Sequence, residues 1–292
     1  MAFALKSGER IAPGLQRVVS RELRKAMDDA ERLDPVHAAF ALRKRIKKLR
    51  SILRLLRDEL GADYDRHTKR LRKTAHVFAT IRDADAAVAT MDAIHARYPD
   101  VVSDDRCEAV KKALLARKRG VDTRADAGAT LHRALNDLQD WSKTFAKDVR
   151  HAARRRTLRS GMVRVYRTTR KALEAAEASG DDRAFHRWRR RTKDHWYHLR
   201  LIERLNSAAR RRAKEVRRLE TWLGNAHNLV LFKALLLEDP SRFGDERATA
   251  VILGCAEKFQ KSLRRRALRE GHALFDAKPS RFSRSARGWI RG

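Results

Sequence analysis

Basic residues recur at spacings of three or four between positions 43 and 57 and form the most distinctive chemical feature of the chain. They are Arg43, Lys47, Arg50, Arg54 and Arg57, and no carboxylate interrupts them. On an α-helix they lie in one stripe about 21 Å long. Like charges at this spacing repel by a few tenths of a kcal/mol per pair, so we expect water or a polyanion to cover the stripe.

An apolar stripe beside these cations predicts the helix that carries them. Its members recur with the 3.6-residue period of a helix and are Leu42, Ile46, Leu49, Leu53, Leu56 and Leu60. Asp34 followed by Pro35 predicts the start of this helix, and Gly61 predicts its end. We therefore expect one helix over residues 35–60 that buries its leucines and presents its cations.

A similar stretch occurs in the second half of the chain. A shift by half of the 292 residues brings Arg43 onto Arg189, Lys47 onto Lys193 and Arg54 onto Arg200. Basic residues of the preceding segment repeat at the same shift: Arg21, Arg24 and Lys25 align with Arg167, Arg170 and Lys171. A further block, residues 78–83, aligns with residues 223–228 at almost the same shift. Three blocks in the same order predict an internal duplication.

Helical periodicity dominates the rest of the chain, and strict strand alternation is absent, so the predicted fold is all-α. We expect helices over residues 13–33, 35–60, 63–98, 103–118, 130–149, 157–178, 182–205, 208–237 and 245–274. The duplication then predicts two four-helix bundles, at residues 10–150 and 151–275, that together form one domain. The serines, glycines and arginines of residues 276–292 predict a basic flexible tail.

The charge of the chain implies an anionic partner. Lys and Arg number 69 against 37 Asp and Glu, which gives a formal net charge of +32. Because 42% of the residues are hydrophobic, we expect a folded basic protein rather than a disordered tail. Nucleic acid, another polyphosphate and a membrane surface all fit such a charge. The two cysteines lack metal-ligand spacing and favour a reduced, cytoplasmic compartment, and the longest apolar run is too short to cross a membrane.

The segment around His186 resembles the sequence signature of the CHAD family, the conserved histidine α-helical domains. The signature H-x-x-R-[KR]-x-x-K-x-x-[RW]-Y matches His186, Arg189, Arg190, Lys193, Trp196 and Tyr197. Arg43, Lys44, Lys47 and Arg50 resemble its first-half counterpart, and residues 82–85 and 223–229 are similar to two later motifs of the family. Departures from the pattern are Phe40 at the first-half histidine position, Trp196 and Glu203 in place of basic residues, and Asn228 in place of Asp.

This resemblance implies two bundles related by pseudo-two-fold symmetry, with a basic groove between them that binds inorganic polyphosphate. A polyphosphate chain has many charges and no bases, so its binder needs many cations along a path, with Arg giving forked contacts and Lys point charges. The candidate binding residues are Arg21, Arg24, Lys25, Arg43, Lys44, Lys47, Arg50, Arg54, Arg167, Arg170, Lys171, His186, Arg189, Arg190, Lys193, Arg200 and His227. We expect Arg82, Asp83 and Tyr197 to support them.

Other functions stay open at this point. No Walker loop, G-x-G-x-x-G motif or nucleophile elbow is present, so we expect non-catalytic binding without a cofactor or metal ion. The alternative is sequence-independent binding of DNA or RNA, although aromatic residues are only 7% and no stacking platform is evident. A third interpretation is a cytoplasmic assembly protein of polyphosphate granules, which would use the same basic stripes.

Overall fold

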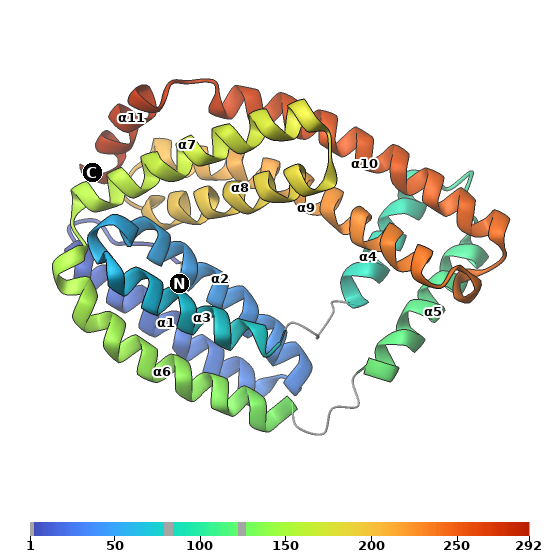
Figure 1. Ribbon diagram of the computed structural model, residues 1–292, viewed down its shortest axis with the longest axis horizontal. Helices are drawn as coiled ribbons and strands as arrows, with labels where there is room; N and C mark the ends of the chain where they lie inside the picture. Colours follow the sequence, from blue (N-terminus) through green and yellow to red (C-terminus); the bar gives the residue numbers. More distant parts are fainter. Residues whose placement is uncertain (1–2, 79–83, 122–126, 292) are drawn as a thin grey trace.

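The computed structural model describes residues 3–78, 84–121 and 127–291 (Figure 1). These residues form α-helices and one 3-10 helix, with no strand among them, so the all-α prediction is confirmed. The helices are α1 Ile11–Arg32, α2 Pro35–Leu60, α3 Ala62–His76, α4 Ala84–Arg97, α5 Asp104–Val121, α6 Ala127–Ala152, α7 Arg155–Ser179, α8 Asp182–Ile202, α9 Ser207–Glu238, η1 Pro240–Phe243, α10 Glu246–Phe275 and α11 Pro279–Arg291. None of these helices has the length and apolar character needed to cross a membrane.

Helix α2 begins and ends at the residues that its local signals predict. The Asp34 side chain accepts hydrogen bonds from the backbone N–H groups of Val36 and His37 at 3.1 and 3.2 Å, and Pro35 occupies the first turn. Gly61 ends the helix with a φ of +50°, in the left-handed region that glycine adopts at little cost. The helix over residues 35–60 is therefore confirmed.

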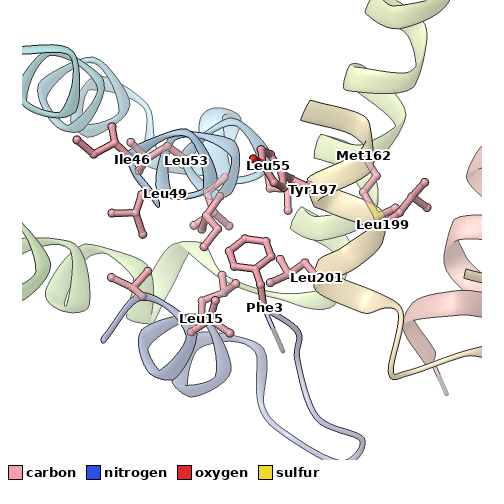
Figure 2. Packing of buried hydrophobic residues seen from close by; sticks show 14 of the residues in the cluster. Phe3, Leu15, Ile46, Leu49, Leu53, Leu55, Met162, Tyr197, Leu199 and Leu201 are labelled. Carbon is pink, nitrogen blue, oxygen red and sulfur yellow. The ribbon is translucent and has the colours of Figure 1, made fainter. Parts of the chain in front are cut away.

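The first group of helices consists of α1, α2, α3 and α6, which pack on the leucine face of α2. Leu42, Ile46 and Leu49 are at most 1% exposed there. The Gln16 side chain on α1 donates to the carbonyl of Ala146 on α6 at 2.6 Å, which ties the outer helices together. Figure 2 shows Phe3, from the segment before α1, inserted between Leu15 and Leu201 of α8, so the N-terminal segment joins this group to the second half.

The second group consists of α7, α8, α9 and α10, and it also receives α4 and α5 (Figure 1). Met91 and Ile94 of α4 share a separate apolar core with Phe232 of α9 and Ile252 of α10. At 32 and 30 residues, α9 and α10 are the longest described helices, and their apolar far halves need cover that α4 and α5 provide. The predicted duplication into two four-helix bundles is thus not confirmed, because two first-half helices pack on the second half.

Two sequence predictions about the course of the chain are wrong. The helix expected over residues 63–98 is two helices, because α3 ends at His76 and α4 starts at Ala84. Residues 276–292 were expected to form a flexible tail, but Pro279–Arg291 forms α11. Phe282, Ala286 and Ile290 recur one helical turn apart and are buried, and the Phe282 ring stacks on Tyr166 of α7 at 4.2 Å.

Candidate functional site

Helices α2 and α8 cross at Ser51 and His198, and this crossing fixes their basic stripes relative to each other. The buried His198 ring donates its Nε2 hydrogen to the carbonyl of Ser51 at 2.9 Å. Arg54 Nη1 donates to Asp194 Oδ1 at 2.8 Å across the same contact. In Figure 1 the two helices diverge from this end toward their N-termini, and the basic residues of both stripes mostly precede the crossing in the sequence.

The basic residues beyond the crossing form what we call the α2–α8 cluster: Arg43, Lys47, Arg50, Arg189, Arg190 and Lys193. The charges of Lys193 and Arg189 on α8 act directly on Lys47 of α2. The charge of Arg190 acts in the same way on Arg50. The two predicted stripes therefore lie opposite each other, and the structure brings six of the candidate residues together.

The electrostatics of the cluster show concentrated positive charge. Burial, followed by the charges of Lys193, Arg43, Arg189 and Lys44, lowers the pKa of Lys47 to about 8. The Lys47 side chain nevertheless remains accessible to solvent. Thus it lies within the basic wall and can still meet a ligand from outside.

Arg50 has a similar environment and shows that α3 also contributes to it. Burial, and then the charges of Arg54, Arg72 and Arg190, lower the pKa of Arg50 to about 10. Lys47, Arg50 and Arg190 make no ion pair with any residue that the structure describes. Arg72 was missed by the sequence analysis because it stands on a mostly polar helix outside both stripes.

Buried hydrogen-bonding atoms without partners gather in the same place. Arg50 Nε, Arg189 Nε and His186 Nδ1 are inaccessible to solvent and have no hydrogen-bond partner within the described ranges. Burying such a donor without a partner costs free energy, about 1–3 kcal/mol for a typical group. The cluster thus retains hydrogen-bonding capacity that the protein itself does not satisfy.

His186 on α8 and His227 on α9 form a pair at the edge of the cluster. Their ring centroids are 4.4 Å apart. Burial, then the charges of Arg189 and Arg190, lower the pKa of His186, and burial with Arg189 and His186 lowers the pKa of His227 to about 4. His227 is therefore neutral at pH 7, and the lowered pKa of His186 favours the same form; a neutral imidazole donates one N–H and adds no charge.

Some candidate residues are already paired with carboxylates. Lys193 Nζ lies 2.9 Å from Glu220 Oε1 on α9. Arg54 is held by Asp194, and Arg200 lies 4.0 Å from Glu203 and over the Trp196 ring. These side chains combine a structural contact with their place on the stripe. Only the structure shows the partners Asp194 and Glu220, which lie across a helix interface.

The candidates on α1 and α7 lie apart from the cluster, Lys44 borders it, and two candidates lie outside the described residues. Arg21, Arg24 and Lys25 stand on α1, and Arg167, Arg170 and Lys171 on α7; no hydrogen bond or ion pair within the described segments joins them to the cluster. Arg170 pairs with Glu174 at 3.1 Å, and Lys44 lies over the Phe40 ring at 3.9 Å. Binding by these residues stays a prediction, and Arg82 and Asp83 lie outside the described residues.

Tyr197, predicted to support the site, is a buried packing residue. Its ring contacts Phe3 and Trp196, with centroid distances of 6.0 and 4.9 Å, and it is 5% exposed. Burial, then the charge of Glu220, raises the pKa of Tyr197 to about 12, so its hydroxyl is protonated at neutral pH. Tyr197 thus holds α8 against the N-terminal segment.

Comparison with known proteins matches the sequence of the chain to a family model. The model of the CHAD domain matches residues 10–237. The matched segment contains both basic stripes and the His186–His227 pair, and it ends within α9, before α10 and α11. No curated protein matches the chain.

Proposed function

Since the chain belongs to the CHAD domain family, we propose that it binds inorganic polyphosphate at the α2–α8 cluster without catalysing a reaction on it. The observation that carries this proposal is the opposition of the two stripes, because Lys193 and Arg189 are close enough to lower the pKa of Lys47. A linear polyanion between α2 and α8 would neutralise both stripes at once. It would also offer acceptors to the exposed cations Lys47 and Arg190, which make no ion pair with a described residue.

The surroundings of the cluster favour polyphosphate over nucleic acid. Single-stranded nucleic acids gain much of their affinity from bases stacked on aromatic side chains. The tryptophan next to the stripe of α8, Trp196, has the guanidinium groups of Arg200 and Arg217 over its ring at 5.3 and 4.5 Å. Its face is therefore occupied by the protein's own cations, and the cluster offers charge and hydrogen bonds instead.

The proposal also covers the origin of the two stripes, the absence of a cofactor, and the location of the protein in the cell. We take the stripes of α2 and α8 as copies from an internal duplication, so that each half supplies one wall of the binding path. Polyphosphate is then the partner, neither a cofactor nor a metal ion takes part, and the protein would act in the cytoplasm on polyphosphate granules.

The first experiment measures binding of labelled long-chain polyphosphate at about 0.15 M salt, where exposed charges are strongly screened. The test variant reverses two exposed cations of the cluster, Lys47→Glu with Arg190→Glu. The matched control, Lys112→Glu with Lys258→Glu, makes the same charge change at exposed lysines of α5 and α10. We expect the test variant to lose binding and the control to keep it.

Competition and product analysis complete the experiment. Double-stranded DNA and RNA at equal phosphate concentration should displace the labelled polyphosphate poorly, and no phosphate should be released from it. The proposal is wrong if the test variant binds as well as the control, or if nucleic acid competes on equal terms. A separate variant, Arg24→Glu with Arg167→Glu, shows whether bound polyphosphate also contacts the basic residues of α1 and α7.

A further inference from the structure

A cationic pocket lies where α7, the start of α9 and α11 meet. Its volume is about 250 Å³. Arginines Arg211 and Arg212 of α9 and Arg281 of α11 line it, together with the aromatic residues Tyr166, Phe282 and Trp289. Part of its wall comes from α11, beyond the residues that the family model matches, so this pocket is a feature separate from the α2–α8 cluster.

The charges of this pocket favour an anion. Glu215 is the one carboxylate among the side chains that line it, and it lies 3.5 Å from Arg212 Nη1. Arg212 also donates to the carbonyl of Leu274, so its guanidinium is held in place. Arg211 and Arg281 are exposed and make no ion pair with a described residue. Because α9 starts at Ser207, its partial positive charge adds to that of the arginines.

The aromatic side of the pocket favours a planar group. The Tyr166 and Phe282 rings are stacked at 4.2 Å, and the Tyr166 hydroxyl donates to the carbonyl of Ala277 at 2.8 Å, so these two rings form a fixed wall. Trp289 meets the edge of Phe282 at 5.6 Å and is only partly buried. An inorganic phosphate chain has no group that would use these rings, whereas a planar ring packs on them.

We propose that this pocket binds a nucleotide unit, with its phosphate on Arg211 and Arg281 and its base against Trp289. The pocket is smaller than the range of about 300–1,000 Å³ typical of drug-sized ligands, which suits one nucleotide and not a longer segment. The unit has two possible sources, a free mononucleotide and the phosphorylated end of a nucleic acid strand, and both present the same chemistry to the pocket.

Calorimetric titration of the full chain with AMP tests this proposal. Arg281→Ala removes an exposed guanidinium that lines the pocket, and Arg287→Ala removes an exposed guanidinium of the same helix that does not. We expect Arg281→Ala to weaken AMP binding by about tenfold or more, as the loss of one charge-assisted hydrogen bond does. Arg287→Ala should bind AMP as the natural sequence does, and adenosine and inorganic phosphate should each bind more weakly than AMP.

Further titrations distinguish the two sources of the nucleotide unit, and distinguish this pocket from the α2–α8 cluster. If a 5′-phosphorylated oligoribonucleotide binds more tightly than AMP, and loses this advantage without its terminal phosphate, the ligand is the end of a strand. If AMP binds more tightly than the oligoribonucleotide, the ligand is the free nucleotide. The Lys47→Glu, Arg190→Glu variant should lose polyphosphate and keep AMP. The nucleotide proposal is overturned if Arg281→Ala and Arg287→Ala bind AMP equally, if inorganic phosphate equals AMP, or if the cluster variant loses AMP as well.

Discussion

Lys47 is the cation through which the proposed polyphosphate binding should depend on pH. Burial and the charges of Lys193, Arg43 and Arg189 lower its pKa to about 8 in the free protein. A bound polyanion supplies negative charge beside the ammonium group and raises its pKa toward the ordinary lysine value of about 10.4. Between these two values the free side chain is mostly neutral and the bound one is charged. Binding in this pH range therefore takes up a proton.

The size of the effect follows from the two pKa values. At pH 9, about one in eleven free Lys47 side chains is charged if the pKa is about 8, whereas nearly all are charged when the pKa is about 10.4. Binding then takes up about 0.9 proton per chain at pH 9 and about 0.1 at pH 7. Because the protonated form is the one that binds, the same linkage weakens polyphosphate binding about tenfold from pH 7 to pH 9.

Titration calorimetry in two buffers of different ionisation enthalpy measures this proton uptake. The control is Lys47→Arg, which keeps the positive charge and stays protonated throughout this pH range. We expect it to bind polyphosphate with nearly equal affinity at pH 7 and pH 9. Subtracting its proton uptake from that of the natural sequence removes the contributions of the N-terminus and of the other lysines.

Two results would refute the reasoning. One is equal proton uptake by the natural sequence and Lys47→Arg at pH 9. The other is an affinity of the natural sequence that stays constant from pH 7 to pH 9. Either result means that the ammonium group of Lys47 does not face the bound anion, whatever binds elsewhere on the protein.

Two further predictions concern the salt dependence of binding and the stability of the fold. Replacing Lys47 and Arg190 together by glutamine should lower the slope of log affinity against log salt concentration by about 1.4, the value for two lost contacts with a flexible polyanion; an unchanged slope contradicts their contact with the ligand. Gly161→Ala should lower the free energy of unfolding, measured by urea denaturation, by at least about 1–3 kcal/mol. The reason is that the added methyl group would lie 2.1 Å from the carbonyl oxygen of Leu55, where α7 meets α2. Gly254→Ala, a helical position with open space, is the control and should not destabilise.

The parts of the fold that the sequence predicts well are those set by neighbouring residues. The bounds of α2 follow from Asp34, Pro35 and Gly61, and each acts within one helical turn. Its buried and charged faces follow from the helical period in the same way, and Leu42 and Ile46 are buried as expected. The candidate residues of the cluster come from this local pattern and from the resemblance, which together indicated both stripes.

The parts that the sequence did not predict depend on contacts between distant segments. The apolar residues of α4 indicate a buried face, but only the fold shows that this face packs on Phe232 and Ile252 rather than within the first half. Phe282 and Ile290 of α11 recur at helical spacing, and the arginines, serines and glycines around them concealed this signal. Their burial depends on Tyr166, more than a hundred residues earlier in the chain.

The carboxylates around the stripes separate a structural section from the section that we propose binds polyphosphate. At the crossing, where α2 and α8 touch, Asp194 neutralises Arg54, as packing of two cationic helices requires. At a shift of half the chain, the counterpart of Asp194 is Lys48, which points to the other side of α2 and pairs with Glu22 at 2.7 Å. Where the helices diverge, Lys47, Arg50 and Arg190 have no such partner in the described part of the chain. Lys193, also beyond the crossing, pairs with Glu220. A carboxylate at the contact, and three cations beyond it without one among the described residues, form the distribution expected if an anion from outside completes the site.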